Sequence, residues 1–247
     1  MEISKEAAEA LRNLDTGLAE LTGRLEKRAP ASERDAPLIP FLQSTASNAL
    51  AVRILFLGGV RWALIANART ALEAATDAVY FAMYEPRVEA TARCYLFEIY
   101  EFALLMADMD ADSNATPADV DAVLAKAKDG PLAKAAATET YDPEFAAAIR
   151  KAADELELSF REARSNRRHV PHWSTKSYYK RAEVVGGAIG GIDATRLRLT
   201  YSLLSRGVHA RMRAQERSEV GLDGASVLVG TGLALRLGVV AFDRCFR

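Results

Sequence analysis

Residues 61–84 read RWALIANARTALEAATDAVYFAMY, and this stretch decides the fold. Its apolar residues, mostly alanines, fall on nearly every side of a 3.6-residue period, which is typical of a helix surrounded by other helices. The pattern stops before Pro86, because a residue that precedes proline disfavours the helical conformation. The stretch therefore predicts the central helix of an all-α protein.

Helical patterns also cover most of the remaining chain. Only 15 Gly and 8 Pro occur among 247 residues, and they separate the patterns rather than interrupt them. Half of the residues are hydrophobic, which is enough for a sizeable core. Besides 61–84, we expect helices at about residues 3–28, 41–57, 87–109, 117–130, 142–165, 178–185, 193–208 and 226–245.

The first of these helices carries a narrow apolar seam. The seam residues step by three and four positions: Ile3, Ala7, Leu11, Leu14, Leu18, Leu21 and Leu25. Such a seam suits a coiled-coil-like contact, either with the protein's own bundle or with a second subunit. We see no linker long enough to demand a further boundary. The expected organisation is an N-terminal amphipathic helix at 1–28 and a single helical-bundle domain at 41–247.

Composition excludes several classes of protein. The net charge of −1 gives no overall attraction to nucleic acid or to a membrane. Cys94 and Cys245 do not form a disulfide framework, and the charged N-terminus does not resemble a secretory signal, so a cytoplasmic location is expected. The most membrane-like stretch, 225–242, contains Arg236, which favours a buried terminal helix over a membrane span.

A charged stripe crosses the central helix. Between residues 62 and 84 the only charged side chains are Arg69, Glu73 and Asp77, and their spacing of four places them on one side of the helix. Charged groups within an apolar helix are costly unless they are paired. The stripe predicts either an internal Arg69–Glu73 ion pair that orders the bundle or the polar wall of a pocket.

The helix after Asp193 carries a second polar stripe, which consists of Arg198, Tyr201, Ser205 and His209. His209 lies near the helix end, where an imidazole is either a cap or a group for acid–base chemistry. We expect Arg69 and Glu73 to be largely buried, within hydrogen-bonding reach of each other, and near this stripe.

Positive charge is concentrated in residues 161–217, which contain 13 basic and 4 acidic side chains. Aromatic and histidine side chains interleave with the bases, a combination that suits phosphate contacts and base stacking. The alternative is a solvated face that balances the acidic first half. The candidate substrate-binding residues are Arg164, Arg167, Arg168, His169, His172 and Trp173.

Several chemistries have no motif in this chain. No histidine follows a glutamate by three residues, so the Glu-x-x-His motif of di-iron bundles is missing. His169 and His172 have no nearby carboxylate or thiolate to complete a metal site. Neither a phosphate-binding glycine loop nor a nucleophile elbow occurs. We therefore expect neither a metal nor a cofactor.

Three segments resemble a known superfamily: residues 68–75 (ARTALEAA) followed by Tyr80, then Trp173-Ser174, and then residues 201–209 (YSLLSRGVH). Over about 41–210, the chain is similar to bacterial helical proteins of unknown function that belong with the HEPN superfamily of nucleotide- and RNA-associated bundles. The resemblance implies a HEPN-like antiparallel helical bundle with additional N- and C-terminal helices.

The resemblance also implies a function. Many HEPN proteins are metal-independent ribonucleases of toxin or phage-defence systems, and their Arg-x4–6-His motifs meet across a homodimer. The implied catalytic set is His209, Ser205, Tyr201, Arg206, Arg198, Glu73 and Arg69, acting on RNA or a nucleotide. Cleavage by 2′-hydroxyl attack needs a base, an acid and a cation.

The chain departs from the HEPN pattern at one place. Residues 202–204 read SLL where the arginine before His209 is expected, and Arg206 is too close to His209. The expected spacing occurs instead from Arg164 to His169 and from Arg167 to His172. The leading hypothesis is an RNA-binding effector or ribonuclease. The alternatives are a non-catalytic helical interaction module, that is, a degenerate HEPN protein, and a bundle that binds a small molecule.

Overall fold

The computed structural model describes residues 4–28, 32, 34–60, 63–110, 117–165, 171–189, 193–213 and 224–246. At residues 107–110, 117–120, 164–165 and 206–213 it describes the backbone alone. Every regular element in these ranges is an α-helix and none is a strand, which confirms the all-α prediction. The chain divides into two compact units, Met1–Met83 with Tyr178–Arg247, and Tyr84–Ser177. This division was not anticipated from the sequence, which led us to expect one bundle domain.

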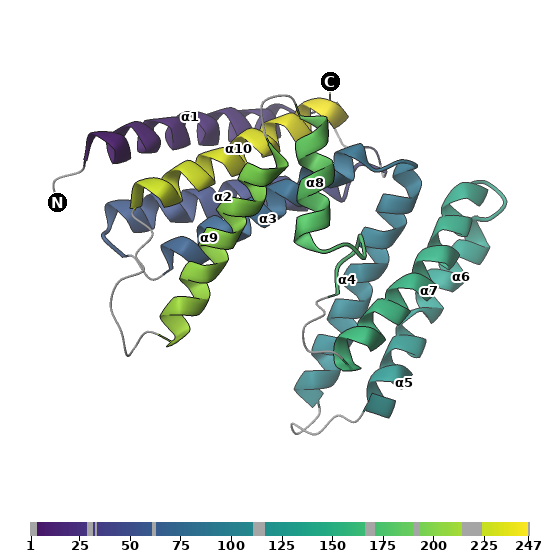
Figure 1. Ribbon diagram of the computed structural model, residues 1–247. Coiled ribbons are helices and arrows are strands. Elements are labelled where there is room, and N and C mark those ends of the chain that lie inside the picture. Colours follow the sequence, from purple (N-terminus) through teal and green to yellow (C-terminus); the bar gives the residue numbers. More distant parts are fainter. Residues whose placement is uncertain are drawn as a thin grey trace. The chain divides into compact units, whose positions relative to one another are not determined.

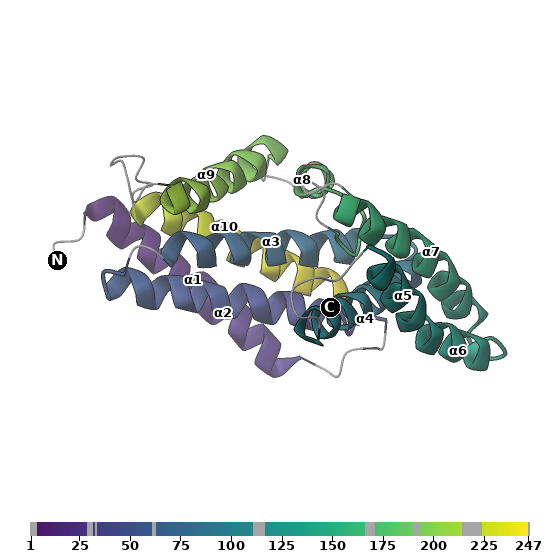
Figure 2. The ribbon, with the colours of Figure 1, turned by 90° about the horizontal axis from the view of Figure 1, so that it is seen from below.

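The first unit is organised around α3, as the alanine-rich pattern predicted. Its helices are α1 (Lys5–Lys27), α2 (Leu38–Leu57), α3 (Leu64–Met83), α8 (Tyr178–Ala188), α9 (Ala194–Arg213) and α10 (Gly224–Phe246). Helix α3 packs mainly on α2 and α10 and also contacts α8 and α9 (Figures 1 and 2). Every residue from 74 to 82 is buried, because neighbouring helices surround this half of α3.

Helix α1 belongs to the same unit. Its seam packs on α10 and α2, and Ala7, Leu14, Leu21 and Leu25 are buried there. The approach of α1 to α10 is close, since a Cβ atom at Gly17 would lie 3.1 Å from Cβ of Leu235. These buried seam residues are therefore used within the chain, and the expectation of a second subunit at this helix stays a prediction.

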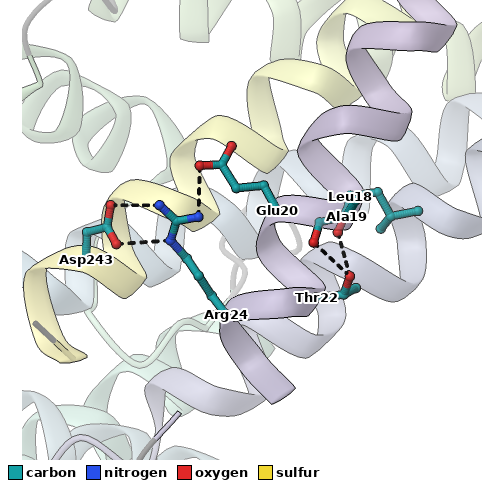
Figure 3. A network of polar contacts seen from close by, with 6 residues as sticks. All are labelled: Leu18, Ala19, Glu20, Thr22, Arg24 and Asp243. Carbon is teal, nitrogen blue, oxygen red and sulfur yellow. Dashed lines mark hydrogen bonds and ion pairs between the residues drawn. The ribbon is translucent and has the colours of Figure 1, made fainter. Parts of the chain in front are cut away.

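Arg24 connects the C-terminal half of α1 to the end of α10 through hydrogen bonds with Asp243 (Figure 3). Arg24 Nε donates to Asp243 Oδ1 at 3.1 Å, and its Nη2 donates to Oδ2 at 3.4 Å. Its Nη1 donates to Glu20 Oε1 at 2.8 Å. The hydrogen bond with Asp243, which outweighs the opposing effect of desolvation, raises the pKa of Arg24.

Helix α10 is long and apolar enough to cross a membrane by length and composition. In the protein it packs against α1, α2 and α3, and 61% of its most apolar 18-residue stretch is buried. The helix is therefore largely buried, as we expected from the presence of Arg236 within its apolar stretch. Gly238 allows the contact with α1, since a Cβ there would lie 3.0 Å from Cδ2 of Leu21.

The second unit contains α4 (Arg87–Asp110), α5 (Pro117–Ala127), α6 (Asp129–Thr138) and α7 (Pro143–Ser165). Its core is formed by the facing sides of α4 and α7, with Tyr100, Ile149, Leu156 and Phe160 buried between them. Helix α6 was not predicted. Gly130 was expected to end a helix, whereas a proline at the next position is compatible with the first turn of a new one.

Candidate functional site

The stripe on α3 begins with an ion pair. Nε and Nη2 of Arg69 both donate to Oε1 of Glu73, at 3.3 and 3.2 Å. The prediction that these residues lie within hydrogen-bonding reach is confirmed. The prediction that they are largely buried is wrong, because the two side chains are 27% and 32% exposed. Their edge of α3 is only partly covered by α9, and the neighbouring Ala66 and Thr70 on the same edge are exposed.

Tyr201 of α9 completes this contact. Arg69 Nη2 donates to the Tyr201 hydroxyl at 3.0 Å, and the guanidinium carbon lies 5.2 Å from the centre of the Tyr201 ring. Burial, followed by the negative charge of Glu73, raises the pKa of Tyr201. The phenol is therefore a neutral hydrogen-bonding group at physiological pH and not a base. The predicted proximity of Arg69 and Glu73 to the stripe of α9 is confirmed at this residue.

Two tyrosines at the start of α8 pack around Tyr201. The ring of Tyr178 stacks on it, with centroids 3.8 Å apart and an interplanar angle of 16°. The ring of Tyr179 meets it edge-on at 6.0 Å, and the Tyr179 hydroxyl lies 3.0 Å from Oγ of Ser202. Tyr178 is buried, whereas Tyr179 is 46% exposed. Tyr179 therefore offers an accessible aromatic ring next to the residue that binds Arg69.

The third charge of the stripe has a different partner. Asp77 Oδ1 lies 2.6 Å from Nε of Arg181 on α8, and both side chains are buried. The adjacent Thr76 hydroxyl lies 3.2 Å from the Tyr178 hydroxyl, and burial raises the pKa of Tyr178. Arg181 was not assigned to this site from the sequence. The sequence did indicate that Asp77 needs a cation from another helix. A buried carboxylate requires a cation, and the only cation of α3, Arg69, pairs with Glu73.

The remaining described residues of the α9 stripe are less directly involved. Arg198 Nη2 donates to Glu183 of α8 at 2.9 Å, and both side chains are substantially exposed. Ser205 lies on the same side of α9 as Tyr201, and its Oγ makes no hydrogen bond with a described residue. Arg198 and Arg69 are thus each neutralised by a carboxylate of the same unit.

Several predicted site residues lie outside the described residues. His209 and Arg206 belong to α9, but only their backbone is described. The same holds for Arg164 in α7, and residues 166–170, which include Arg167, Arg168 and His169, are not described at all. The predictions for these six residues remain predictions.

His172 and Trp173 belong to the second unit. His172 Nδ1 lies 2.8 Å from Ser174 Oγ and accepts from the Ser174 amide at 3.1 Å, so this nitrogen closes a turn. Trp173 is 3% exposed and packs between Tyr84 and His172. A ring buried in this way offers no free face to a base, so the expectation that Trp173 stacks on a substrate finds no support.

No group of three or more His, Cys, Asp or Glu side chains within the described ranges is arranged to hold a metal ion. The sequence matches no model of a known protein family, and neither a curated protein nor a solved structure is significantly similar to it. The chemistry of the Arg69–Glu73–Tyr201 contact must therefore be inferred from its own geometry.

Proposed function

We propose that this protein is a HEPN-like, RNA-binding effector whose first unit carries the RNA-contacting site. One observation supports the proposal above the others. Arg69 and Tyr201, 132 positions apart in the sequence, are in direct contact. They come from the two longest segments that carry the HEPN resemblance, 68–75 and 201–209. In a chain with that resemblance, such convergence is expected if both segments serve one site.

The chemistry of the proposed site follows from its residue types. Arg69, Arg198 and Arg206 are cations for backbone phosphates, and Tyr201 and Ser205 supply neutral hydroxyls that orient a phosphate or the imidazole of His209. Metal-independent RNA cleavage then uses His209 as the proton-transfer group for 2′-hydroxyl attack. Residues 161–217, the basic segment, begin in the second unit. Their side chains there are proposed as further RNA contacts, separate from the site of the first unit: Arg164, Arg167, Arg168, His169 and His172.

The test uses purified protein and mixed single-stranded RNA with a chelator present throughout. We expect binding, and cleavage that is lost in His209→Ala while binding is retained. Arg167→Ala or Arg168→Ala should instead weaken binding and reduce the salt dependence by about 0.7 for each phosphate that is no longer neutralised. Loss of cleavage on adding chelator, or its persistence in His209→Ala, would contradict the proposed chemistry. Absence of RNA binding by the wild-type protein would contradict the proposed function itself.

A second candidate, a non-catalytic interaction module, is favoured by one exposed face of α2. Leu50, Ile54 and Leu57 follow a four-then-three spacing, and they are 44%, 57% and 46% exposed. The only charged residue of α2 is Arg53, which is paired with Asp15 at 2.5 Å. Two copies of this face would therefore meet without like charges in contact. The homodimer that the resemblance implies is accordingly proposed at α2.

Light scattering at micromolar concentration tests this face. We expect a dimer mass for the wild type and a monomer mass for Ile54→Glu, because a carboxylate buried without a partner opposes association. Leu158→Glu, at a leucine of α7 that is 58% exposed, is the matched charge control away from this face and should remain dimeric. A monomeric wild type would exclude α2 as a self-association surface.

A further inference from the structure

The Arg69–Glu73 ion pair is incompletely engaged. Both contacts from Arg69 converge on one oxygen of Glu73, at 3.3 and 3.2 Å. Charge-assisted hydrogen bonds from guanidinium to carboxylate are usually about 2.7–2.9 Å long and often use both oxygens in parallel. An arginine held by one oxygen at these distances can exchange its partner for a better one.

Part of the guanidinium also remains available. Nε and Nη2 are used by Glu73 and Tyr201, whereas no described residue accepts from Nη1. The side chain is 27% exposed, so an acceptor can approach from solvent. A phosphodiester presents two oxygens to such an edge, and guanidinium binds phosphate in a bidentate geometry.

An exposed aromatic ring adjoins this cation. Tyr179 packs edge-on against Tyr201, whose hydroxyl accepts from Arg69, so Arg69, Tyr201 and Tyr179 form a continuous row of contacts. The Tyr179 ring is held in place by its hydrogen bond with Ser202. A fixed ring beside a cation is the combination that binds single-stranded nucleic acid, with a base on the ring and a phosphate on the cation.

We propose that Arg69 and Tyr179 bind one phosphate and one base of single-stranded RNA, and that Glu73 competes with that phosphate for Arg69. This inference rests on the proposed function and adds a regulatory role for Glu73. In the free protein the carboxylate neutralises Arg69 and keeps weak anions out. An RNA phosphate must displace it, so the carboxylate lowers the affinity for RNA rather than supporting it.

If Glu73 competes with the phosphate, removing its charge should raise the affinity for RNA. Glu73→Gln keeps the shape of the side chain but frees the charge of Arg69. We expect labelled single-stranded RNA to bind about ten-fold more tightly at low salt, and the slope of log affinity against log salt to steepen by about 0.7, the value for one neutralised phosphate on a single strand. Glu73→Asp, which withdraws the carboxylate by one methylene, should give a smaller gain.

Fluorescence anisotropy with chelator present measures all variants. Glu139→Gln, which removes an exposed carboxylate from an ion pair with Arg150, is the control for net charge and should match the wild type. In the Arg69→Gln background, Glu73→Gln should give no gain in RNA affinity. In the wild-type background, Tyr179→Ala should weaken RNA binding and leave the slope of log affinity against log salt unchanged. Circular dichroism verifies that each variant is folded.

The outcomes separate the inference from the proposed function. If the wild type binds RNA and Glu73→Gln behaves like Glu139→Gln, the competition is refuted and the proposed function stands. A gain that persists without Arg69 also refutes it. If neither the wild type nor any variant binds RNA, the proposed function fails and the inference fails with it.

Discussion

The two ion pairs of α3 should differ sharply in their contribution to stability, although they involve the same helix. Asp77 and Arg181 are buried, whereas Arg69 and Glu73 are 27% and 32% exposed. Removing one partner of a buried pair leaves an unpaired charge in the interior and costs about 3–5 kcal/mol. Removing one partner of a solvent-accessible pair costs about 0–1 kcal/mol.

Asp77→Ala should therefore lower the free energy of unfolding by about 3–5 kcal/mol, and Glu73→Ala by about 1 kcal/mol or less. At about 2–4 °C per kcal/mol for a chain of this size, Asp77→Ala should reduce the melting temperature by about 6–20 °C. Urea unfolding followed by circular dichroism at 222 nm measures both variants under the same conditions.

The double variant Asp77→Ala with Arg181→Met is the internal control. It removes both charges of the buried pair, so it should be more stable than Asp77→Ala alone. If Glu73→Ala proves as destabilising as Asp77→Ala, the difference in burial does not govern these pairs. If the double variant is less stable than the single one, the cost does not arise from the buried guanidinium that Asp77 balances.

Two further predictions concern packing and pH. Gly186→Ala should destabilise the first unit by about 1–3 kcal/mol, because its Cβ would lie 2.4 Å from the backbone nitrogen of Ala194. Gly187→Ala is the control in the same urea assay. A Cβ there would meet nothing within 4 Å, so this variant should be neutral or slightly stabilising. Burial raises the pKa of Tyr100 and Tyr178, so stability present below the ordinary phenol pKa of about 10 should be lost as the pH rises further. In a titration at 295 nm, these phenols should ionise only as the protein unfolds; reversible ionisation of all 8 tyrosines near pH 10 without unfolding would contradict this.

Local helical periodicity was largely visible in the sequence. The alanine-rich stretch ending before Pro86 predicted a central helix, and α3 is buried as expected. The spacing of four between Arg69 and Glu73 also sufficed to predict their contact, because it depends only on helix geometry. The missed helix, α6, carries a Gly-Pro pair in its first turn, and such a pair occurs both where a helix ends and where a new one starts.

Interactions between distant segments needed the tertiary structure. The seam of α1 was compatible with two partners, and only the structure shows that its buried residues pack on α10 and α2 of the same chain. The Gly186-Gly187 pair predicts a helix end, yet α8 continues past it and Gly186 permits the close approach of Ala194. Helical patterns specify which face is apolar but not which surface will cover it.

The candidate site shows the same division. Sequence alone determined that α3 carries three charges on one side and that α9 carries a tyrosine and a serine on one side. Only the fold decided that Tyr201 meets Arg69, that Asp77 pairs with Arg181, and that Tyr179 rather than Trp173 is the exposed ring. The physical reason is that pairing and burial depend on distances between helices far apart in the chain, whereas periodicity depends only on neighbours within one helix.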